Sequence, residues 1–268
     1  MSMKDLHCLT NDSLELEHTA NGVLDGKTFV AKDLIAVEGH ISSFGNARWR
    51  ETHSASQTTS PTISRLLGVG ADLVGMAKLD QLAGSLVGNI GEDEAPINTL
   101  YTDRFTGGSS SGSASAVASG LVDFAIGTDT AGSVRVPAAA CGLYGLRPSY
   151  DALSKEGVLP WADAFDAVGI LSKELGLVSA VFDVLSEKGV EQTPITKIFL
   201  PKAAFELASP EATEAIIAAT HEIVEKQGVS VEEIDFTDCI DQSIADLFSR
   251  IASRDNWKAH GEWITENN

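Results

Sequence analysis

The chain has 268 residues, 43% hydrophobic and 21% charged, a globular composition with enough apolar material for a sizeable core. Its 19 Lys and Arg against 38 Asp and Glu give a formal net charge of −19, which argues against nucleic acid and anionic membrane surfaces as main partners. No apolar run approaches the roughly 18 residues of a spanning helix, no signal peptide opens the chain, and the three cysteines are widely spaced, so we expect a cytoplasmic protein.

The first part of the chain predicts short strands and helices in alternation. Residues 1–24 are polar and acidic and predict a loose lead-in. The run KTFVA at 27–31 indicates a strand. A Ser-Pro pair at 60–61 opens a helix, with Ser as the N-cap and Pro at the first helical position. The run DLVGM at 72–76 predicts a buried strand, and we expect a second helix from about Leu79.

The middle of the chain is rich in small residues. Residues 89–106 predict a long loop, and GGSSSGSASAVASG follows at 107–120. From Ser113 onward this run predicts a helix whose Ala/Ser surface lets other backbone approach closely. A strand is expected over 122–126, followed by a small-residue turn over 127–133.

The last third of the chain alternates clearly between helix and strand patterns. Its strongest signal is a helix that Ser209-Pro210 opens and Gly228 ends, with an apolar stripe through Ile216 and Ile223. Such alternation implies a sheet layered with helices, of the α/β class. The other predicted elements are a strand near Tyr144, a helix over 175–186, and strands over 197–200 and 229–234.

The segment 107–113 permits three functional interpretations. A phosphate-binding P-loop fits its glycine spacing, but Ser113 stands where the motif requires lysine. A nucleophile elbow would make Ser110 the nucleophile, but the preceding residues form a poor buried strand. That motif also needs a downstream histidine, and of the two available, His221 and His260, the first lies in the periodic helix.

The third interpretation joins two serine-bearing turns and a lysine. Ser109 lies in GGSSSGSA, Ser133 lies 24 residues later in GTDTAGSVRVPA, and Lys32 lies upstream in FVAKDLIAVEG. These motifs, in this order, resemble the amidase signature family, which uses a Ser-cisSer-Lys triad. The resemblance runs over 29–169 and includes the runs GLRPS and DAFDAVG near its end. It implies an amidase signature fold, a mixed sheet sandwiched between helices.

The resemblance implies a role for each member of the trio. Ser133 would be the nucleophile, Ser109 the bridging serine, held by a cis peptide bond after Gly108, and Lys32 the base. A serine hydroxyl needs such a base, because it is a weak nucleophile until its proton is accepted. A free lysine has a pKa of about 10.4, whereas a useful base needs roughly 7–8. Burial can supply this difference, provided that the neighbouring Asp33 points away.

The resemblance also implies an oxyanion hole and a supporting set. The backbone N–H groups of Thr130, Ala131, Gly132 and Ser133 would receive the oxyanion of the tetrahedral intermediate. Ala131 stands where the family usually has glycine, so a positive φ there would strain the turn. The supporting residues are Gly108, Ser110 and an ion pair between Asp129 and Arg135.

The runs EGHISSFGN at 38–46 and HSASQTTS at 53–60 look closest to the small cytosolic amidases of the indole-3-acetamide type. We therefore expect hydrolysis of a small carboxamide to a carboxylate and ammonia, with no cofactor or metal. One alternative is an amidotransferase A-type subunit that releases ammonia from glutamine. The other is a catalytically weak or inactive amidase-like binding module.

The resemblance also bears on domain organisation. We expect a single amidase domain over 1–268, with the signature core at 29–169 and a helix and strand extension over 170–268. Family members usually continue well beyond the segment that ends here. A chain shortened at the C-terminus is expected to expose a sheet edge or an apolar patch, which a homodimer could cover.

Overall fold

The computed structural model describes residues 5–11, 13–91, 94–186, 193–235 and 242–267. Contacts divide the chain into two compact units, the first comprising Met1–Val190 with Arg254–Asn268 and the second Glu191–Ser253. This division differs from the single domain expected over 1–268. The second unit separates because its two strands pair only with each other among the described strands.

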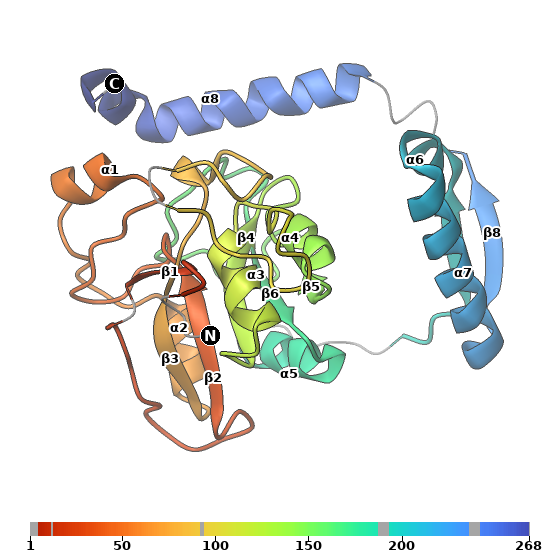
Figure 1. Cartoon of the computed structure of the whole chain (residues 1–268), viewed down its shortest axis with the longest axis horizontal. Helices are drawn as coiled ribbons and strands as arrows, with labels where there is room; N and C mark the ends of the chain where they lie inside the picture. The colour runs from red at the N-terminus through yellow and green to blue at the C-terminus, as the bar shows by residue number, and fades with distance from the viewer. Residues whose placement is uncertain (1–4, 12, 92–93, 187–192, 236–241, 268) are drawn as a thin grey trace. The chain divides into compact units, whose positions relative to one another are not determined.

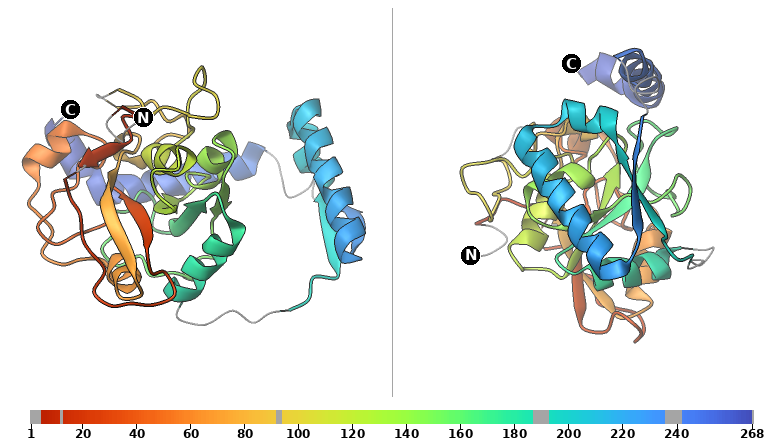
Figure 2. Two further views of the ribbon diagram at one scale, coloured as in Figure 1. Left: turned by 60° about the horizontal axis from the view of Figure 1, so that its bottom comes forward. Right: turned by 90° about the vertical axis from the view of Figure 1, so that its right-hand side faces the viewer.

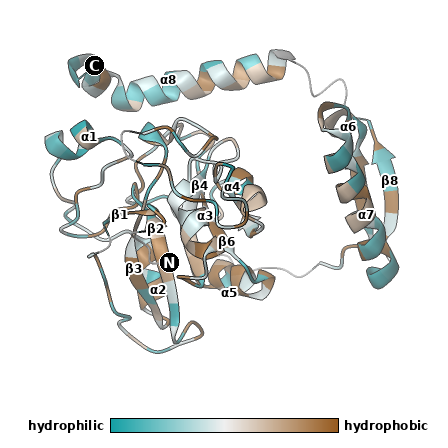
Figure 3. Ribbon diagram, viewed as in Figure 1, coloured by the Kyte–Doolittle hydropathy of each residue, from teal (hydrophilic) through white to brown (hydrophobic). Residues whose placement is uncertain are grey.

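The first unit is built on a six-stranded mixed sheet of order β1-β3-β2-β4-β6-β5 (Figure 1). The three central strands β3, β2 and β4 run parallel, β1 and β6 pair antiparallel with β3 and β4, and β5 pairs antiparallel with β6. Strands β3 and β6 carry mostly apolar residues (Figure 3), as strands covered on both faces do. The strands are β1 Leu9–Asn11, β2 Lys27–Lys32, β3 Ala71–Ala77, β4 Phe124–Asp129, β5 Tyr144–Leu146 and β6 Ala167–Ser172.

Helices cover both faces of this sheet (Figure 2), which confirms the predicted sandwich. Phe29 and Ala31 of β2 pack in one core cluster with residues of α2 and α5. Val30, between them, packs in a second cluster with residues of α3 and α4. Since successive side chains of a strand alternate between faces, Lys32 points to the α3 side. The helices of this unit are α1 Ala47–Thr52, α2 Pro61–Leu67, α3 Ser111–Ala118, α4 Arg135–Ala140 and α5 Leu175–Leu185.

The second unit contains two strands with two helices between them along the chain. Its two strands are parallel, with Lys197 opposite Ser230. The predicted long helix is present, but its apolar stripe is not buried, because Ile216 and Ile223 are 48% and 49% exposed. A sheet of two strands buries little of the helix surface. The elements are β7 Lys197–Pro201, α6 Lys202–Leu207, α7 Pro210–Gln227 and β8 Ser230–Ile234.

The N-terminal segment differs from the loose lead-in expected over 1–24, of which residues 1–4 and 12 lie outside the described residues. Strand β1 pairs antiparallel with β3, and Leu16 forms a further bridge to Leu73. Leu6, Cys8 and Leu24 are fully or almost fully buried. These few apolar residues, spaced among acidic ones, anchor the segment to the sheet.

Three further elements differ from the sequence predictions. The helix expected from about Leu79 is only a short 3-10 turn, η1 (Gln81–Ala83), in which Leu82 has a left-handed φ of 49°. Strand β4 begins two residues later than predicted and continues to Asp129. Helix α8 (Gln242–Asn267) was not predicted. None of the described helices combines the length and the apolar composition that crossing a membrane requires.

The start of α3 lies unusually close to neighbouring backbone. A methyl group added at Gly112 would lie 2.2 Å from the carbonyl oxygen of Cys8 and 2.6 Å from the backbone nitrogen of Lys78. We expect Gly112→Ala to destabilise the fold by about 3 kcal/mol, because backbone cannot move aside cheaply. Gly176→Ala in α5 is the matched control, since a methyl group there meets nothing and improves helix propensity. Urea unfolding measures both, and equal midpoints would contradict the close approach.

Candidate active site

Lys32 is completely buried at the end of β2. Its Nζ lies 2.8 Å from Oγ of Ser109 and 2.9 Å from Oγ1 of Thr128, with the Thr128 carbonyl oxygen at 3.5 Å. Burial lowers the pKa of Lys32 from 10.5 to about 7, although Asp80, Asp166 and Asp129 act in the opposite direction. A neutral amine has two N–H groups and one lone pair. The two Thr128 oxygens can take the N–H groups, which leaves the lone pair for the Ser109 hydroxyl.

The three predicted triad residues come from three chain segments that meet at one edge of the sheet. Lys32 ends β2, and Ser133 lies in the turn after the parallel strand β4. Ser109 lies just before α3, after a cis peptide bond between Gly108 and Ser109 as expected. The N–H of Ser110 donates to the Ser133 carbonyl oxygen at 3.1 Å, which ties the two turns together.

The two serines are both inaccessible or nearly so, Ser109 being 0% and Ser133 5% exposed. Of the two links in the predicted chain, the one from Lys32 to Ser109 is a hydrogen bond of this structure. Within the described part of the chain, the Ser133 hydroxyl has no hydrogen-bond partner. The geometry therefore supplies a base bonded to one hydroxyl, with a second hydroxyl in the adjoining turn.

Asp80 supports the turn that carries Ser109. This buried residue donates its N–H to the Ser109 carbonyl oxygen at 3.2 Å, and its Oδ2 accepts the N–H of Gly88 at 2.9 Å. A cavity of about 420 Å³ is lined by Asp80 and Ser111, among others, but not by Ser133. The cavity thus borders Asp80, which supports the turn of Ser109, and does not reach Ser133.

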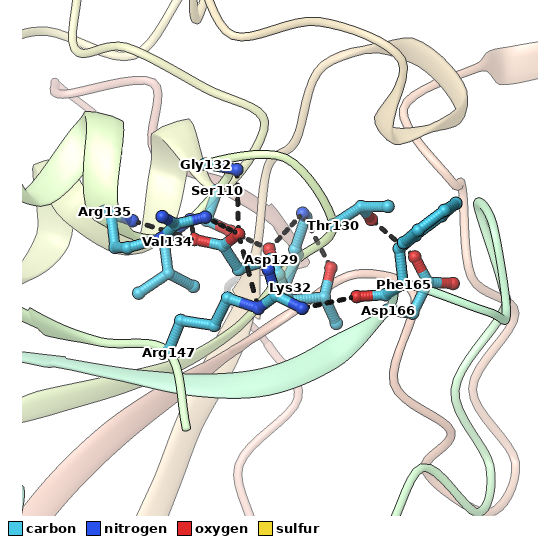
Figure 4. Close-up of polar contacts among 11 residues, drawn as sticks. Lys32, Ser110, Asp129, Thr130, Gly132, Val134, Arg135, Arg147, Phe165 and Asp166 are labelled. Atoms are coloured by element: carbon cyan, nitrogen blue, oxygen red, sulfur yellow. Dashed lines mark hydrogen bonds and ion pairs between the residues drawn. The ribbon is translucent and has the colours of Figure 1, made fainter. Parts of the chain in front are cut away.

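The predicted ion pair between Asp129 and Arg135 is present (Figure 4). The Arg135 Nε and Nη2 groups donate to the two carboxylate oxygens at 3.0 and 2.9 Å. Burial alone would raise the pKa of Asp129, but the Arg135 guanidinium and the N–H groups of Val134 and Arg135 hold it below its ordinary value. Asp129 is fully buried, so this carboxylate stays charged and fixes the start of α4.

The Asp129 carboxylate leaves fewer backbone N–H groups free to bind an oxyanion than the sequence predicted. Asp129 Oδ1 accepts the N–H of Gly132 at 2.8 Å, so this predicted donor is already engaged. The N–H groups of Ala131 and Ser133 have no acceptor among the described residues. Gly132 has a φ of 134°, whereas Ala131 has no left-handed φ. The alanine that replaces the family's usual glycine therefore does not strain the turn.

Asp33 points away from the lysine, as the expected role of Lys32 requires and as strand alternation allows. The carboxylate is fully buried, lies 2.6 Å from Nε2 of His40 and accepts both the N–H and the hydroxyl of Ser43. It therefore holds the loop that follows β2. The Asp33 carboxylate bonds to His40 and Ser43 and not to the amine of Lys32. The absence of an adjacent carboxylate partner among the described residues favours the neutral form of that amine.

Sequence reasoning missed two residues of the site, Thr128 and Asp166. Thr128 lies in the GTD motif, so its place beside an implied catalytic turn was a usable signal. The Asp166 carboxylate accepts hydrogen bonds from the Thr130 hydroxyl and from the N–H groups of Trp161 and Ala162. The N–H of Ala162 contacts both carboxylate oxygens. In the sequence Asp166 belongs to the run DAFDAVG, which supports the family resemblance but does not indicate what Asp166 contacts.

Known proteins resemble most of the chain in sequence and in structure. Amidase 1 of Arabidopsis thaliana is 47% identical over 165 residues, which cover 62% of this chain and 39% of that protein. The translocon at the outer membrane of chloroplasts 64 of Pisum sativum is 34% identical over 228 residues, covering 84% of this chain and 38% of that protein. The chain thus spans less than half the length of these relatives.

A solved structure described as "Crystal structure of amidase" superposes with a TM-score of 0.81 at 25% identity. The superposition covers 92% of this chain and 56% of that one. The sequence model of the amidase family matches residues 10–259, which is most of the chain. The superposed fold and the match of the sequence model both point to one family, and the chain belongs to the amidase family.

Proposed function

We propose that this chain carries the acyl-transfer site of an amidase that hydrolyses a small carboxamide to a carboxylate and ammonia. The observation that carries the proposal is the fully buried amine of Lys32, bonded to Ser109, with a pKa of about 7. A lysine in such a state is a base near neutral pH, and a base is what a serine nucleophile needs. Ser133, in the adjoining turn, is the nucleophile.

Acylation begins when Ser133 Oγ attacks the carbonyl carbon of the amide. The Ser133 proton passes to Ser109 Oγ while the Ser109 proton passes to Nζ of Lys32, which becomes an ammonium. The carbonyl π electrons move to oxygen and form the tetrahedral oxyanion. The free N–H groups of Ala131 and Ser133, together with that of Thr130, are the donors that would stabilise it.

Collapse of the intermediate breaks the C–N bond. The proton held by Lys32 returns through Ser109 to the leaving nitrogen, which departs as ammonia, and an acyl ester remains on Ser133. Water then attacks the ester, again losing its proton through Ser109 to Lys32. The Ser133 oxygen recovers a proton, and the carboxylate leaves. Every proton transfer uses a group of this chain, so the proposed reaction calls for no cofactor.

We extend the proposal to the setting of the protein. Small amides are its partners, and the acidic composition argues against nucleic acid as a partner. The three widely spaced cysteines favour the cytoplasm as its location. The exposed side chain of Tyr144 on the edge strand β5 is where a homodimer contact would form. Sedimentation of the full chain tests that contact, and Tyr144→Ser should weaken it.

The test of the proposed function is ammonia release from a panel of small amides, with glutamine as a separate arm. Hydroxylamine in the same assay should divert the acyl ester to a hydroxamate, which marks a covalent intermediate. Ammonia and hydroxamate from simple amides would support the amidase. Release from glutamine alone would favour the amidotransferase alternative. Binding without any turnover would favour the binding module.

Removing the bridging hydroxyl should separate the base from the nucleophile. Ser109→Ala is expected to lower kcat by about 10²–10⁴-fold, the usual worth of a positioned proton carrier. Ser113→Ala is the matched control, because this nearby buried hydroxyl has no hydrogen-bond partner among the described residues. Rates of ammonia release measure both variants. An active Ser109→Ala enzyme would show that the proton takes another path.

A further inference from the structure

Asp166 lies directly beside the turn that follows β4 (Figure 4). In the antiparallel pair of β4 and β6, Asp129 stands opposite Ala167, so the next residues in register are Thr130 and Asp166. The Thr130 hydroxyl donates to Oδ1 of Asp166 at 2.5 Å. Both residues are buried, with exposed fractions of 9% and 5%. The bond therefore fixes the first residue of the turn that ends at Ser133.

The carboxylate of Asp166 also closes the loop that precedes it. The N–H of Trp161 donates to Oδ2 at 2.8 Å, and the N–H of Ala162 lies within 3.2 Å of both oxygens. In return, the N–H of Asp166 donates to the Ala162 carbonyl oxygen at 3.0 Å. One buried carboxylate thus joins the loop over 160–164 to the turn over 130–133.

The C-terminal half of α8 holds this loop from its other side. His260 Nε2 lies 2.6 Å from the Pro160 carbonyl oxygen, and Asn256 Nδ2 donates to the Trp161 carbonyl oxygen at 3.2 Å. The ring of His260 is buried and packs edge-on against Phe44 and Trp49. These contacts lie within the first unit and leave the loop little freedom to shift.

We propose that Asp166 is a positioning residue for the turn over 130–133, and that the C-terminal half of α8 acts on that turn through the loop over 160–164. This inference rests on the proposed function, because it gives the turn its role as oxyanion donor. Asp166 itself touches neither the nucleophile nor the base among the described contacts. It acts through the Thr130 hydroxyl.

The expected effect is on turnover rather than on substrate binding. Donors aimed at the oxyanion act on charge that develops in the transition state, so loosening them lowers kcat and leaves KM nearly unchanged. A misplaced donor should lower kcat by about 10–10³-fold. The upper figure corresponds to the complete loss of one donor. A partly unfolded variant would also show a lower apparent kcat at an unchanged KM, so each rate is divided by the folded fraction that urea unfolding gives for that variant.

Two variants test the link between Asp166 and Thr130. Thr130→Val keeps the shape of the side chain but removes the hydroxyl. Asp166→Asn replaces one of the two acceptor oxygens by an NH₂ group, which cannot accept from the Thr130 hydroxyl or the backbone N–H groups. Each is expected to lower kcat at least 10-fold with KM within about 3-fold, whereas Thr130→Ser should restore most of the rate. The control is Asp163→Asn in the same loop, whose exposed carboxylate bonds only to Lys155 among the described residues. Wild-type kcat in Thr130→Val would overturn the proposal.

The contribution of α8 is tested at His260. His260→Ala loses the bond to Pro160 and should lower kcat, while His260→Gln, which retains a donor, should recover part of it. His221→Ala, on α7 of the second unit, should change nothing. An unchanged kcat in His260→Ala would overturn the proposed action of α8 on the turn over 130–133.

Hydrogen exchange separates this inference from the proposed function. Peptides that cover the turn over 130–133 should exchange faster in Thr130→Val, Asp166→Asn and His260→Ala than in the wild type and in Asp163→Asn. This readout needs no turnover. If the wild type released no ammonia from any amide, the proposed function would fail while the exchange data still decided the link. Unchanged exchange in all three variants would overturn the link itself.

Discussion

Ser133→Ala is expected to abolish amide hydrolysis, with kcat lower by on the order of 10⁴–10⁶-fold, as when a serine hydrolase loses its nucleophile. The Ser133 hydroxyl is the atom on which the acyl ester forms in the proposed reaction. Without it, Lys32 and Ser109 have no nucleophile to deprotonate. The variant should also form no hydroxamate with hydroxylamine, because no ester exists to be trapped.

The fold should survive this change, which keeps the test clean. The Ser133 hydroxyl has no hydrogen-bond partner in the described part of the chain, so its loss leaves no donor or acceptor stranded. The free energies of unfolding of Ser133→Ala and of the control Ser113→Ala should both stay within about 1 kcal/mol of the wild type. A Ser133→Ala protein that still releases ammonia at the wild-type rate would move the nucleophile elsewhere and end the proposed mechanism.

The sequence indicated the candidate site where the signal was local. The turns around Ser109 and Ser133 are short motifs whose residues contact one another, so the motifs carry their own geometry. The strand over 27–31 was likewise predicted from local sequence, and the alternation of Phe29, Val30 and Ala31 between the two core clusters follows from strand geometry. The same alternation allowed Asp33 to point away from Lys32, as it does in the structure.

The rest depended on contacts between distant residues. Nothing near Leu79 in the sequence reveals that Asp80 bonds to Gly88 and to the Ser109 backbone, and this bonding goes with a tight turn where a helix was expected. The exposed stripe of α7 shows the reverse case. Its periodicity predicted the helix, but periodicity does not say how much surface the partner sheet offers. The role of Asp166 likewise needs the register of β4 and β6, which no local pattern contains.

Lys32→Met should remove activity almost completely and change its dependence on pH. The base acts only as the neutral amine, so the wild-type rate should rise with pH and reach half its plateau near the pKa of about 7. Lys32→Met is expected to lower kcat by about 10³-fold or more and to lose this rise. The control is Lys173→Met, an exposed lysine at the end of β6. A wild-type rate that does not change between pH 5.5 and 8.5 would contradict the assignment of the base.

The same pKa predicts that Lys32→Met is more stable than the wild type. The folded pKa of about 7 lies below the unfolded value of 10.5, so between these values the unfolded chain binds the proton more tightly, and stability rises with pH. Below pH 7 the burial cost is fully present, about 5 kcal/mol at about 1.4 kcal/mol per pKa unit. It shrinks as pH approaches 10.5.

Methionine removes this cost but also loses the bonds to Ser109 and Thr128, so part of the gain is offset. The advantage of Lys32→Met should therefore be largest at pH 6 and smaller by about 3 kcal/mol at pH 9, whatever its absolute size. Urea unfolding of both proteins at the two pH values measures it. An advantage that did not change with pH would mean that Lys32 keeps an ordinary pKa in the folded protein. A buried lysine that weakens the fold and is retained is what a catalytic base requires, because the desolvation that destabilises its charged form is also what makes it basic at neutral pH.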